Sequence, residues 1–195
     1  MQTPPDLSTL YKQCGARIYG YLRRLTQSTW LAEDLTQETF LRAVENGHSF
    51  RGEGEVTNWL YRIATNLFRD YLRTRTGKTQ DSWEDGEEPE VAQIPSADPP
   101  VLHLLERQEV TQCVRDCITA LPALYRAVLL LYAIEGKSVE ETAVILGCRK
   151  DAVKVRLHRA RQLFKALVSE RCEISTERGG EVNWVPKGPA KEVRS

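Results

Sequence analysis

The sequence predicts an all-α protein of two small helical domains joined by an acidic flexible linker. Apolar residues recur at helical spacing through most of residues 7–75 and again through 101–167. Between them, residues 77–100 contain one basic and seven acidic residues, several prolines and almost no periodicity. With 195 residues, 41% of them hydrophobic, the chain is long enough for two cores of modest size.

The first predicted domain covers residues 1–76 and contains three helices. We expect helices from Leu7 to Thr26, from Thr29 to just before Gly47, and from Asn58 to about Arg75, with Thr57 as the cap of the third. The apolar side chains of the third helix share one face and are expected in the core. They are Leu60, Ile63, Ala64, Leu67 and Tyr71.

An acidic stripe runs along the second predicted helix. Asp34, Glu38, Leu41 and Glu45 recur at offsets of four, three and four, with Gln37 beside them. Ala32, Phe40, Ala43 and Val44 are expected on the other side. Such a stripe is often plain solvated surface, but it is also what a helix offers to a basic partner. The pattern leaves both interpretations open.

The outward face of the third predicted helix is basic and polar. It carries Asn58, Arg62, Thr65, Asn66, Arg69 and Arg73. The loop before it, residues 49–57, contains Phe50 and Arg51. An aromatic ring beside a polar, basic face is suited to holding an unstacked base. Alternatively, Phe50 plugs the small core and the arginines are solvated.

The second predicted domain covers residues 101–171. A helix from about Val101 to Ala120 is followed, after Pro122 at a first helical position, by an apolar helix to Glu135 that ends at Gly136. Residues 137–167 then read as helix, tight turn, helix, because Ser138 and Glu141 form a capping-box pattern and Gly147 interrupts the period. The last helix has one apolar stripe: Val153, Leu157, Ala160, Phe164 and Leu167.

The exposed half of that last helix is basic. Residues 149–165 contain seven lysines or arginines against one acid, Asp151, and Val155 faces away from the apolar stripe. A helix of this kind can enter a DNA major groove, where arginine or lysine reads guanine and an apolar side chain touches a thymine methyl group. A solvated basic helix is the alternative; the capped helix before it favours DNA.

The tail and the cysteines give weaker signals. Residues 172–195 are rich in glycine, proline and mixed charge, which predicts disorder, with Trp184 as a small docking point at most. The five cysteines are odd in number and unevenly spaced, and neither a signal peptide nor an apolar run of membrane-spanning length is present. We therefore expect the protein to reside in a reducing cytoplasm and not to insert into a membrane. Cys113, Cys117 and His103 are candidates for a metal or redox site, although cysteines packed as apolar residues are commoner.

The sequence gives little support for an enzyme. It has no Gly-rich phosphate loop, no HExxH and no GxSxG motif, and only three histidines, so no catalytic residue, metal or cofactor is predicted. A helix-turn-helix regulator that binds duplex DNA without melting it is the main alternative within DNA binding. A purely structural adaptor would lack salt-dependent affinity for DNA.

Three segments together resemble the extracytoplasmic-function (ECF) sigma factors, group four of the sigma-70 superfamily. They are DLTQETFLRA (34–43), SFRGEGEVTNWLYRIATNLFRDYLR (49–73) and LPALYRAVLLLYAIEGKSVEETAVILGCRKDAVKVRLHRARQLF (121–164). The resemblance covers most of residues 7–168 and implies a sigma factor that directs promoter recognition, DNA melting and transcription initiation at stress- or signal-responsive genes. Its implied partners are promoter DNA, core RNA polymerase through the β′ clamp helices and β flap, and an anti-sigma factor.

The resemblance also implies roles for individual residues. Polymerase binding is implied for Asp34, Gln37, Glu38 and Leu41. Binding of the minus-ten element is implied for Phe50, Arg51, Asn58, Arg62, Asn66, Arg69 and Arg73. Binding of the minus-thirty-five element is implied for Arg149, Lys150, Lys154, Val155, Arg156 and Arg159.

Overall fold

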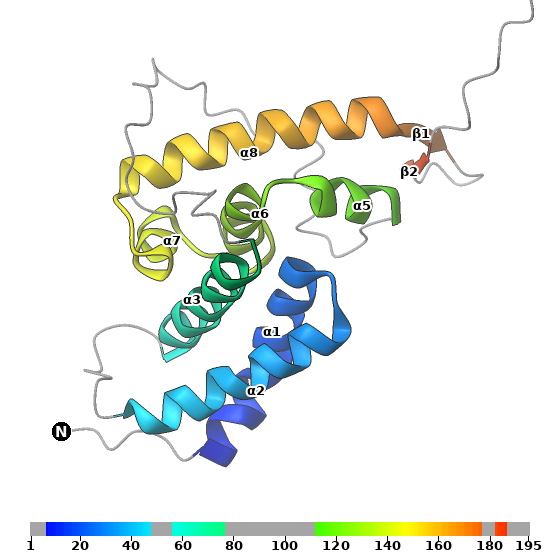
Figure 1. Cartoon of the computed structure of the whole chain (residues 1–195). Coiled ribbons are helices and arrows are strands. Elements are labelled where there is room, and N and C mark those ends of the chain that lie inside the picture. The colour runs from blue at the N-terminus through cyan, green and yellow to red at the C-terminus, as the bar shows by residue number, and fades with distance from the viewer. Residues whose placement is uncertain (1–6, 48–55, 77–111, 177–181, 187–195) are drawn as a thin grey trace, which may run out of the picture.

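The computed structural model describes residues 7–47, 56–76, 112–176 and 182–186. Within these ranges the protein is built almost entirely of helices, arranged as a first group, α1 to α3, and a second group, α5 to α8 (Figure 1). The predicted all-α class with two small helical domains is confirmed. The predicted linker, residues 77–100, lies outside the described residues.

The first domain consists of α1 (Leu7–Thr26), α2 (Thr29–Glu45) and α3 (Val56–Thr76). Ser28 caps α2, because its hydroxyl oxygen accepts a hydrogen bond from the Leu31 amide at 3.2 Å. The third helix begins before Thr57, so the prediction that Thr57 caps it is wrong.

The first domain has an apolar core to which all three helices contribute. Its fully buried side chains are Ile18, Tyr21, Leu22, Leu25, Ala32, Leu60, Tyr61 and Ala64. Thr65 was expected to face outward, but it is 1% exposed and its hydroxyl lies 3.0 Å from that of Tyr21. This bond satisfies both hydroxyls inside the core, where burial raises the pKa of Tyr21.

The second domain begins with α5 (Gln112–Ala120) and α6 (Ala123–Leu129), which continues directly into a π-helical segment, η2 (Leu130–Ile134). Pro122 immediately precedes α6 instead of occupying its first position. In η2 the amide of Glu135 donates to the carbonyl of Leu130, five residues back, at 2.9 Å. The part of the helix predicted from Val101 to residue 111 lies outside the described residues.

The predicted helix-turn-helix is formed by α7 (Val139–Leu146) and α8 (Lys150–Arg171). The capping box is confirmed: Ser138 Oγ accepts from the Glu141 amide at 3.1 Å, and the Glu141 carboxylate accepts from the Ser138 amide at 2.8 Å. Gly147 ends α7 with a φ of 67°, which glycine adopts with little strain. The predicted apolar stripe of α8 is buried, except that Leu167 is only partly so.

A short hairpin follows α8. Strands β1 (Cys172–Thr176) and β2 (Val182–Pro186) pair antiparallel, with Cys172 opposite Pro186 and Ile174 opposite Trp184. The prediction of disorder is therefore wrong for these two segments. The backbone of β2 also lies against α5, so the hairpin is attached to the second domain.

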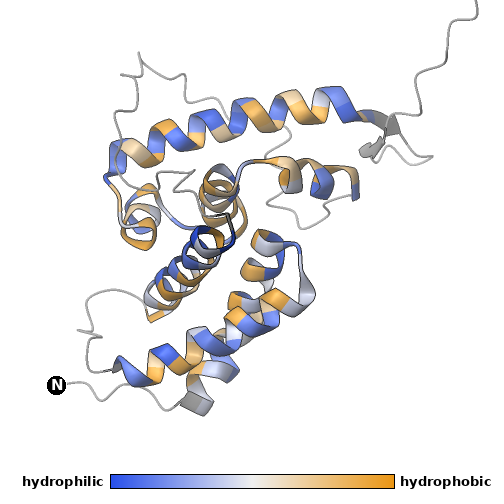
Figure 2. Ribbon diagram, in the orientation of Figure 1, coloured by the Kyte–Doolittle hydropathy of each residue, from blue (hydrophilic) through white to orange (hydrophobic). Residues whose placement is uncertain are grey.

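The two domains pack against each other. The third helix lies between the remainder of the first domain and α7, and α1 contacts both α6 and η2 (Figure 1). Hydropathy along the helices alternates between polar and apolar, as expected for helices that bury one side only (Figure 2). This packing decides which of the candidate binding residues face solvent.

Candidate protein and nucleic-acid interfaces

One face of α2 is open to solvent and mixes acidic with apolar side chains. Asp34 and Gln37 are exposed, and Leu41 keeps 55% of its surface exposed. Glu38 is partly buried and pairs with Arg42 in the same helix at 2.9 Å. Asp34 has no hydrogen bond or ion pair to another described residue, so its carboxylate is available to a partner.

Two large apolar residues extend this face and were missed by the sequence reasoning. Trp30 is 71% exposed, four residues before Asp34, and Val44 is 53% exposed, three residues after Leu41. The expectation that Val44 lies on the opposite side is wrong. We call the exposed set Trp30, Asp34, Gln37, Leu41 and Val44 the α2 face. The signal was a tryptophan in helical register with the acidic stripe.

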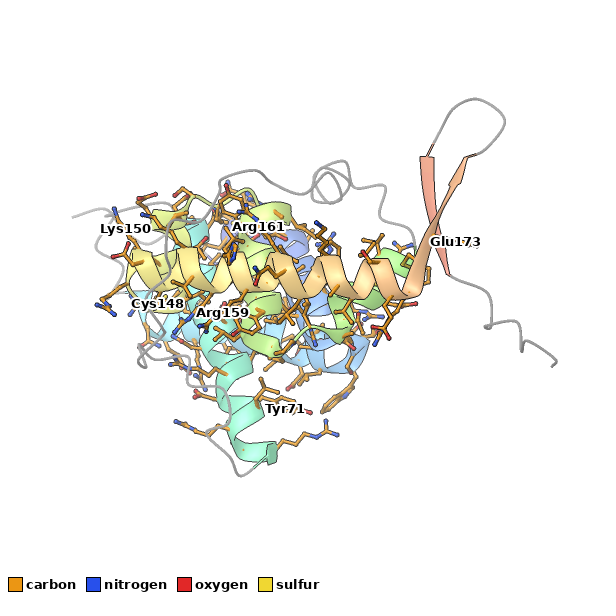
Figure 3. All side chains as sticks on the ribbon, turned by 90° about the horizontal axis from the view of Figure 1, so that it is seen from above. Tyr71, Cys148, Lys150, Arg159, Arg161 and Glu173 are labelled. Atoms are coloured by element: carbon orange, nitrogen blue, oxygen red, sulfur yellow. A yellow bond between two sulfur atoms is a disulfide. The ribbon has the colours of Figure 1, made fainter. Side chains whose placement is uncertain are left out.

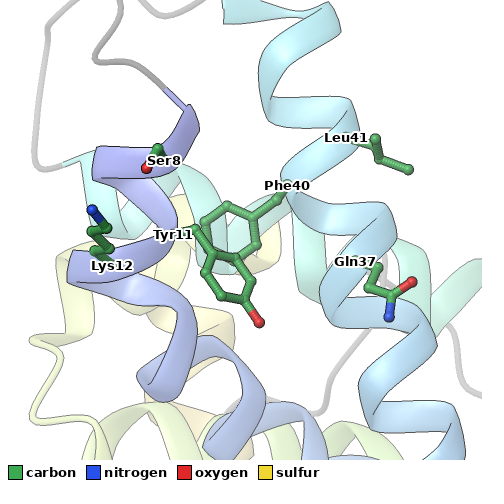
Figure 4. Close-up of a pocket in the computed structure, with 6 residues that line it drawn as sticks. All are labelled: Ser8, Tyr11, Lys12, Gln37, Phe40 and Leu41. Atoms are coloured by element: carbon green, nitrogen blue, oxygen red, sulfur yellow. The ribbon is translucent and has the colours of Figure 1, made fainter.

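A groove of about 500 Å³ lies between α1 and α2 at the edge of the α2 face. Its base is apolar, because Tyr11 and Phe40 pack edge to face with ring centroids 5.0 Å apart. Gln37 and Leu41 belong both to its wall and to the α2 face (Figure 4). The groove is also lined by Ser8 and Lys12. An apolar side chain of a partner helix has a place to insert here.

The candidate minus-ten residues on α3 are only partly accessible. Arg62 and Arg73 are exposed, Asn66 and Arg69 are half-buried, and Arg73 pairs with Asp70 at 3.2 Å. Asn58 is bound to the other domain: its amide nitrogen donates to Glu141 Oε1 at 2.9 Å. Phe50 and Arg51 lie outside the described residues.

The basic end of α8 is exposed. Arg149, Lys150 and Lys154 are accessible to solvent, and Val155 and Arg159 are partly so. Lys150 pairs with Glu140 of α7 at 3.1 Å, and Lys154 pairs with Asp151 at 3.6 Å. Exposed pairs of this kind are weak and exchange readily for other anions. Figure 3, in which α8 is seen from the side, places Lys150 near its first turn and Arg159 further along the helix.

Arg156 differs from its neighbours. It was predicted among the exposed basic residues, but its side chain is 0% exposed. Arg156 follows the buried Val153 by three residues and precedes the buried Ala160 by four, so it lies at the edge of the apolar stripe of α8. In this conformation Arg156 therefore cannot reach a base edge. Arg161, also on α8, places its guanidinium 5.2 Å from the ring centre of Tyr132.

Several polar side chains that hold the two domains together lie in one group, centred on Tyr61 and Glu135, which we call the interdomain cluster. The Tyr61 hydroxyl donates to Glu135, which also pairs with Arg24 at 3.6 Å. Lys137 lies 5.6 Å from the ring centre of Tyr61 and 3.7 Å from Glu141 Oε1. Burial and the negative charge of Glu135 raise the pKa of Tyr61, so its hydroxyl stays protonated and serves as donor.

Glu141 gives this cluster a pH dependence. Hydrogen bonds from Asn58 and from the backbone and side chain of Ser138 lower the pKa of its carboxyl group from 4.5 to about 2. A lowered pKa in the folded state means that the stabilisation is complete above about pH 4.5 and is lost as the pH falls towards 2. We expect Glu141→Gln to flatten the stability profile across that interval, measured by urea unfolding at closely spaced pH values.

The control for this experiment is Glu33→Gln, at an exposed position of α2. The Glu33→Gln variant should lose stability at acidic pH as the wild-type protein does. An unchanged profile for Glu141→Gln would contradict the assignment of the acid dependence to Glu141.

Comparison with known families fits this architecture. Residues 10–77 match the family model of Sigma-70 region 2, and residues 111–164 match that of Sigma-70, region 4. The first match covers α1 to α3, and the second covers α5 to α7 and the basic part of α8. The two domains are thus region 2 and region 4 of a sigma-70-type transcription factor.

Similar full-length proteins specify the group. The chain is 33% identical over 185 residues to the RNA polymerase sigma factor YlaC of Bacillus subtilis, covering 89% of this chain and 98% of the relative. It is 32% identical over 161 residues to the B. subtilis ECF sigma factor SigM, covering 83% and 94%. For the ECF sigma factor SigE of Mycolicibacterium smegmatis the identity is 32%, and the match spans 61% of the relative's length. The chain belongs to the ECF family of RNA polymerase sigma factors.

Solved structures agree with this membership. The chain resembles the sigma factor RpoE of Bartonella quintana, solved with the anti-sigma factor NepR, at a TM-score of 0.62 and 27% identity, covering 83% of this chain and 96% of that one. It also resembles CnrH, solved with the cytosolic domain of CnrY, at a TM-score of 0.58 and 25% identity, covering 84% and 88%. No helix within the described ranges is long and apolar enough to span a membrane.

Family membership settles the class of function. The protein is an alternative sigma factor, a transcription initiation factor that binds core RNA polymerase and promoter DNA, and it is not an enzyme.

Proposed function

We propose that this sigma factor docks on core RNA polymerase through the α2 face while its two domains are still packed together, and then opens to bind the promoter. The observation that carries the proposal is the difference in accessibility between the helices. The α2 face is exposed, whereas Asn58 on α3 is bonded to the second domain and Arg156 on α8 is buried. The docking side is therefore open in the packed form, whereas the DNA-reading sides are open only in part, at residues such as Lys150 and Arg62.

Each candidate surface has a place in this scheme. The β′ clamp helices are the proposed partner of the α2 face, where the groove accepts an apolar side chain and Asp34 meets a basic one. The loop at residues 49–57 and the polar face of α3 bind the minus-ten element and hold a flipped base. The exposed start of α8 binds the minus-thirty-five element, and the second domain contacts the β flap. These events take place in the cytoplasm, at stress- or signal-responsive promoters.

We further propose that an anti-sigma factor holds the protein inactive by stabilising the packed arrangement. The solved sigma factors that this chain resembles include one captured with the anti-sigma factor NepR, and the similarity extends across 83% of this chain. A protein that binds only the packed form shifts the equilibrium away from the open, DNA-binding form. Recovery of polymerase alone in a pull-down from its own cells would contradict this regulation.

The docking role is tested by substituting two exposed residues of α2. Asp34→Asn removes one charge without changing shape, and Leu41→Ala removes the exposed leucine beside the groove. Each is expected to weaken binding to core polymerase about tenfold, as for a central interface residue, and to reduce promoter-specific transcripts in vitro accordingly. The measurement is competition for core polymerase followed by transcription from a library of promoter fragments.

Asp116→Asn is the matched control, because Asp116 is also an exposed helical aspartate but lies on α5. It should leave polymerase binding unchanged. If Asp34→Asn and Leu41→Ala bind core polymerase as the wild-type protein does, the α2 face is not the docking surface. If both variants still direct promoter-specific transcripts at the wild-type level, the α2 face is likewise not the docking surface, but the protein is still a sigma factor.

A further inference from the structure

Three cysteines meet where the second domain begins and where its last helix ends. Cys113 and Cys117 occupy successive turns of α5, and Cys172 follows directly after α8. Cys113 and Cys172, 59 residues apart in sequence, form a disulfide, and the Cys117 Sγ lies 3.8 Å from that of Cys172. All three sulfurs lie within 4.8 Å of one another. Cysteines so far apart in the chain are brought together only by the fold.

The surroundings of this site are apolar. Cys113, Cys117 and Cys172 are 4%, 0% and 3% exposed, and Val114, Ile118 and Val168 are buried in the same core. Burial raises the pKa of the Cys117 thiol, so it remains protonated while the site is closed. The structure therefore contains a disulfide with a third, protected thiol beside it. A disulfide that only joined α5 to the end of α8 would not need a third cysteine beside it.

We propose that Cys113, Cys117 and Cys172 form a thiol–disulfide switch that fastens the end of α8 to α5 when oxidised and releases it when reduced. In the oxidised form, one disulfide closes residues 113–172, which include the basic helix, into a covalent loop. In the reduced form, only apolar packing holds these ends together. The switch uses none of the residues of the α2 face, so it does not depend on the docking scheme proposed above.

The oxidant is a small disulfide of the glutathione type. When the hairpin frays, the Cys172 thiolate attacks one sulfur of the small disulfide, forming a mixed disulfide and expelling one small thiolate. The Cys113 thiolate then attacks the Cys172 sulfur and expels the second small thiolate. Two electrons pass from the protein to the small disulfide, and the two protein protons appear on the two released thiols. Attack by Cys117 on Cys172 transfers the disulfide within the cluster and expels the Cys113 thiolate.

The test counts thiols in the full-length protein. Of its five cysteines, three are free in the structure. We expect five alkylatable thiols after reduction, and three after incubation of the folded protein with oxidised glutathione, with peptide mapping placing the new bond between Cys113 and Cys172. Because the closed loop is long, the oxidised protein should melt about 10 °C higher than the reduced protein.

Variants separate the roles of the three residues. Cys113→Ala should still lose two thiols, through a bond between Cys117 and Cys172, because these sulfurs are already adjacent. Cys148→Ala is the control, since Cys148 is outside the cluster, and it should behave as the wild-type protein apart from one thiol fewer. The proposal is overturned if five thiols remain after oxidation, if Cys14 or Cys148 takes part in the bond, or if melting is unchanged. One equivalent of tightly bound zinc on the reduced protein would also overturn it, in favour of a metal site.

Discussion

Replacing Arg126 with alanine is expected to lower the free energy of unfolding by about 3 kcal/mol, because one guanidinium group connects three segments. Its two terminal nitrogens donate to the carbonyl oxygens of Leu25, Thr119 and Leu121 at 2.6–2.7 Å. The alanine variant leaves these acceptors with no charged donor at the junction of the two domains. Urea unfolding followed by circular dichroism measures the loss.

The control for Arg126→Ala is Arg115→Ala, at an exposed position of α5. We expect it to stay within about 0.5 kcal/mol of the wild-type protein, as for most surface substitutions. Equal losses in the two variants would mean that the three carbonyl bonds do not contribute to stability.

The second large effect is expected from Tyr61→Phe, which removes a single hydroxyl group from the interdomain cluster. The bond from Tyr61 to the buried Glu135 carboxylate is lost, while the ring can keep its edge-to-face contact with Tyr21. A hydrogen bond to a charged group contributes about 2 kcal/mol, so the equilibrium should move roughly thirtyfold towards separated domains. Amide hydrogen exchange in α3 and α7 should accelerate by a similar factor, and promoter DNA should bind more tightly.

Tyr71→Phe provides a matched control, because it makes the same change on the same helix. The Tyr71 hydroxyl accepts a hydrogen bond from Arg75 one turn later at 2.7 Å and bonds no residue in the described part of the second domain. Exchange and promoter affinity should be unchanged in this variant. Acceleration of exchange across the whole protein by Tyr61→Phe would show general loosening instead of domain separation.

Features determined by neighbouring residues were predictable from the sequence. The first helix has the predicted bounds, Leu7–Thr26, and the capping box from Ser138 to Glu141 is formed as expected. Both depend on interactions within a few residues, where spacing and residue type carry the information. The open acidic stripe on α2 followed from the same periodicity.

Features determined by contacts between distant elements were not predictable. Helical period placed Arg156 at the edge of the basic face, but it could not show that the fold covers this position. Nor could it show that Asn58 meets Glu141, 83 residues away, or that Cys172 reaches Cys113. The residues at 48–55, including Phe50 and Arg51, lie outside the described structure, so their assignment to the minus-ten element stays a prediction.

The π-helical segment η2 sets the rotational phase of everything after it. A π turn accommodates one residue more than an α turn, and each residue of an α-helix turns the chain by about 100°. Glu135 and Lys137, which engage Tyr61, directly follow η2. Their alignment with α3 therefore depends on the one additional residue in η2. Loss of one residue from this segment would rotate Glu135 and Lys137 away from Tyr61, although all three residues would still be present.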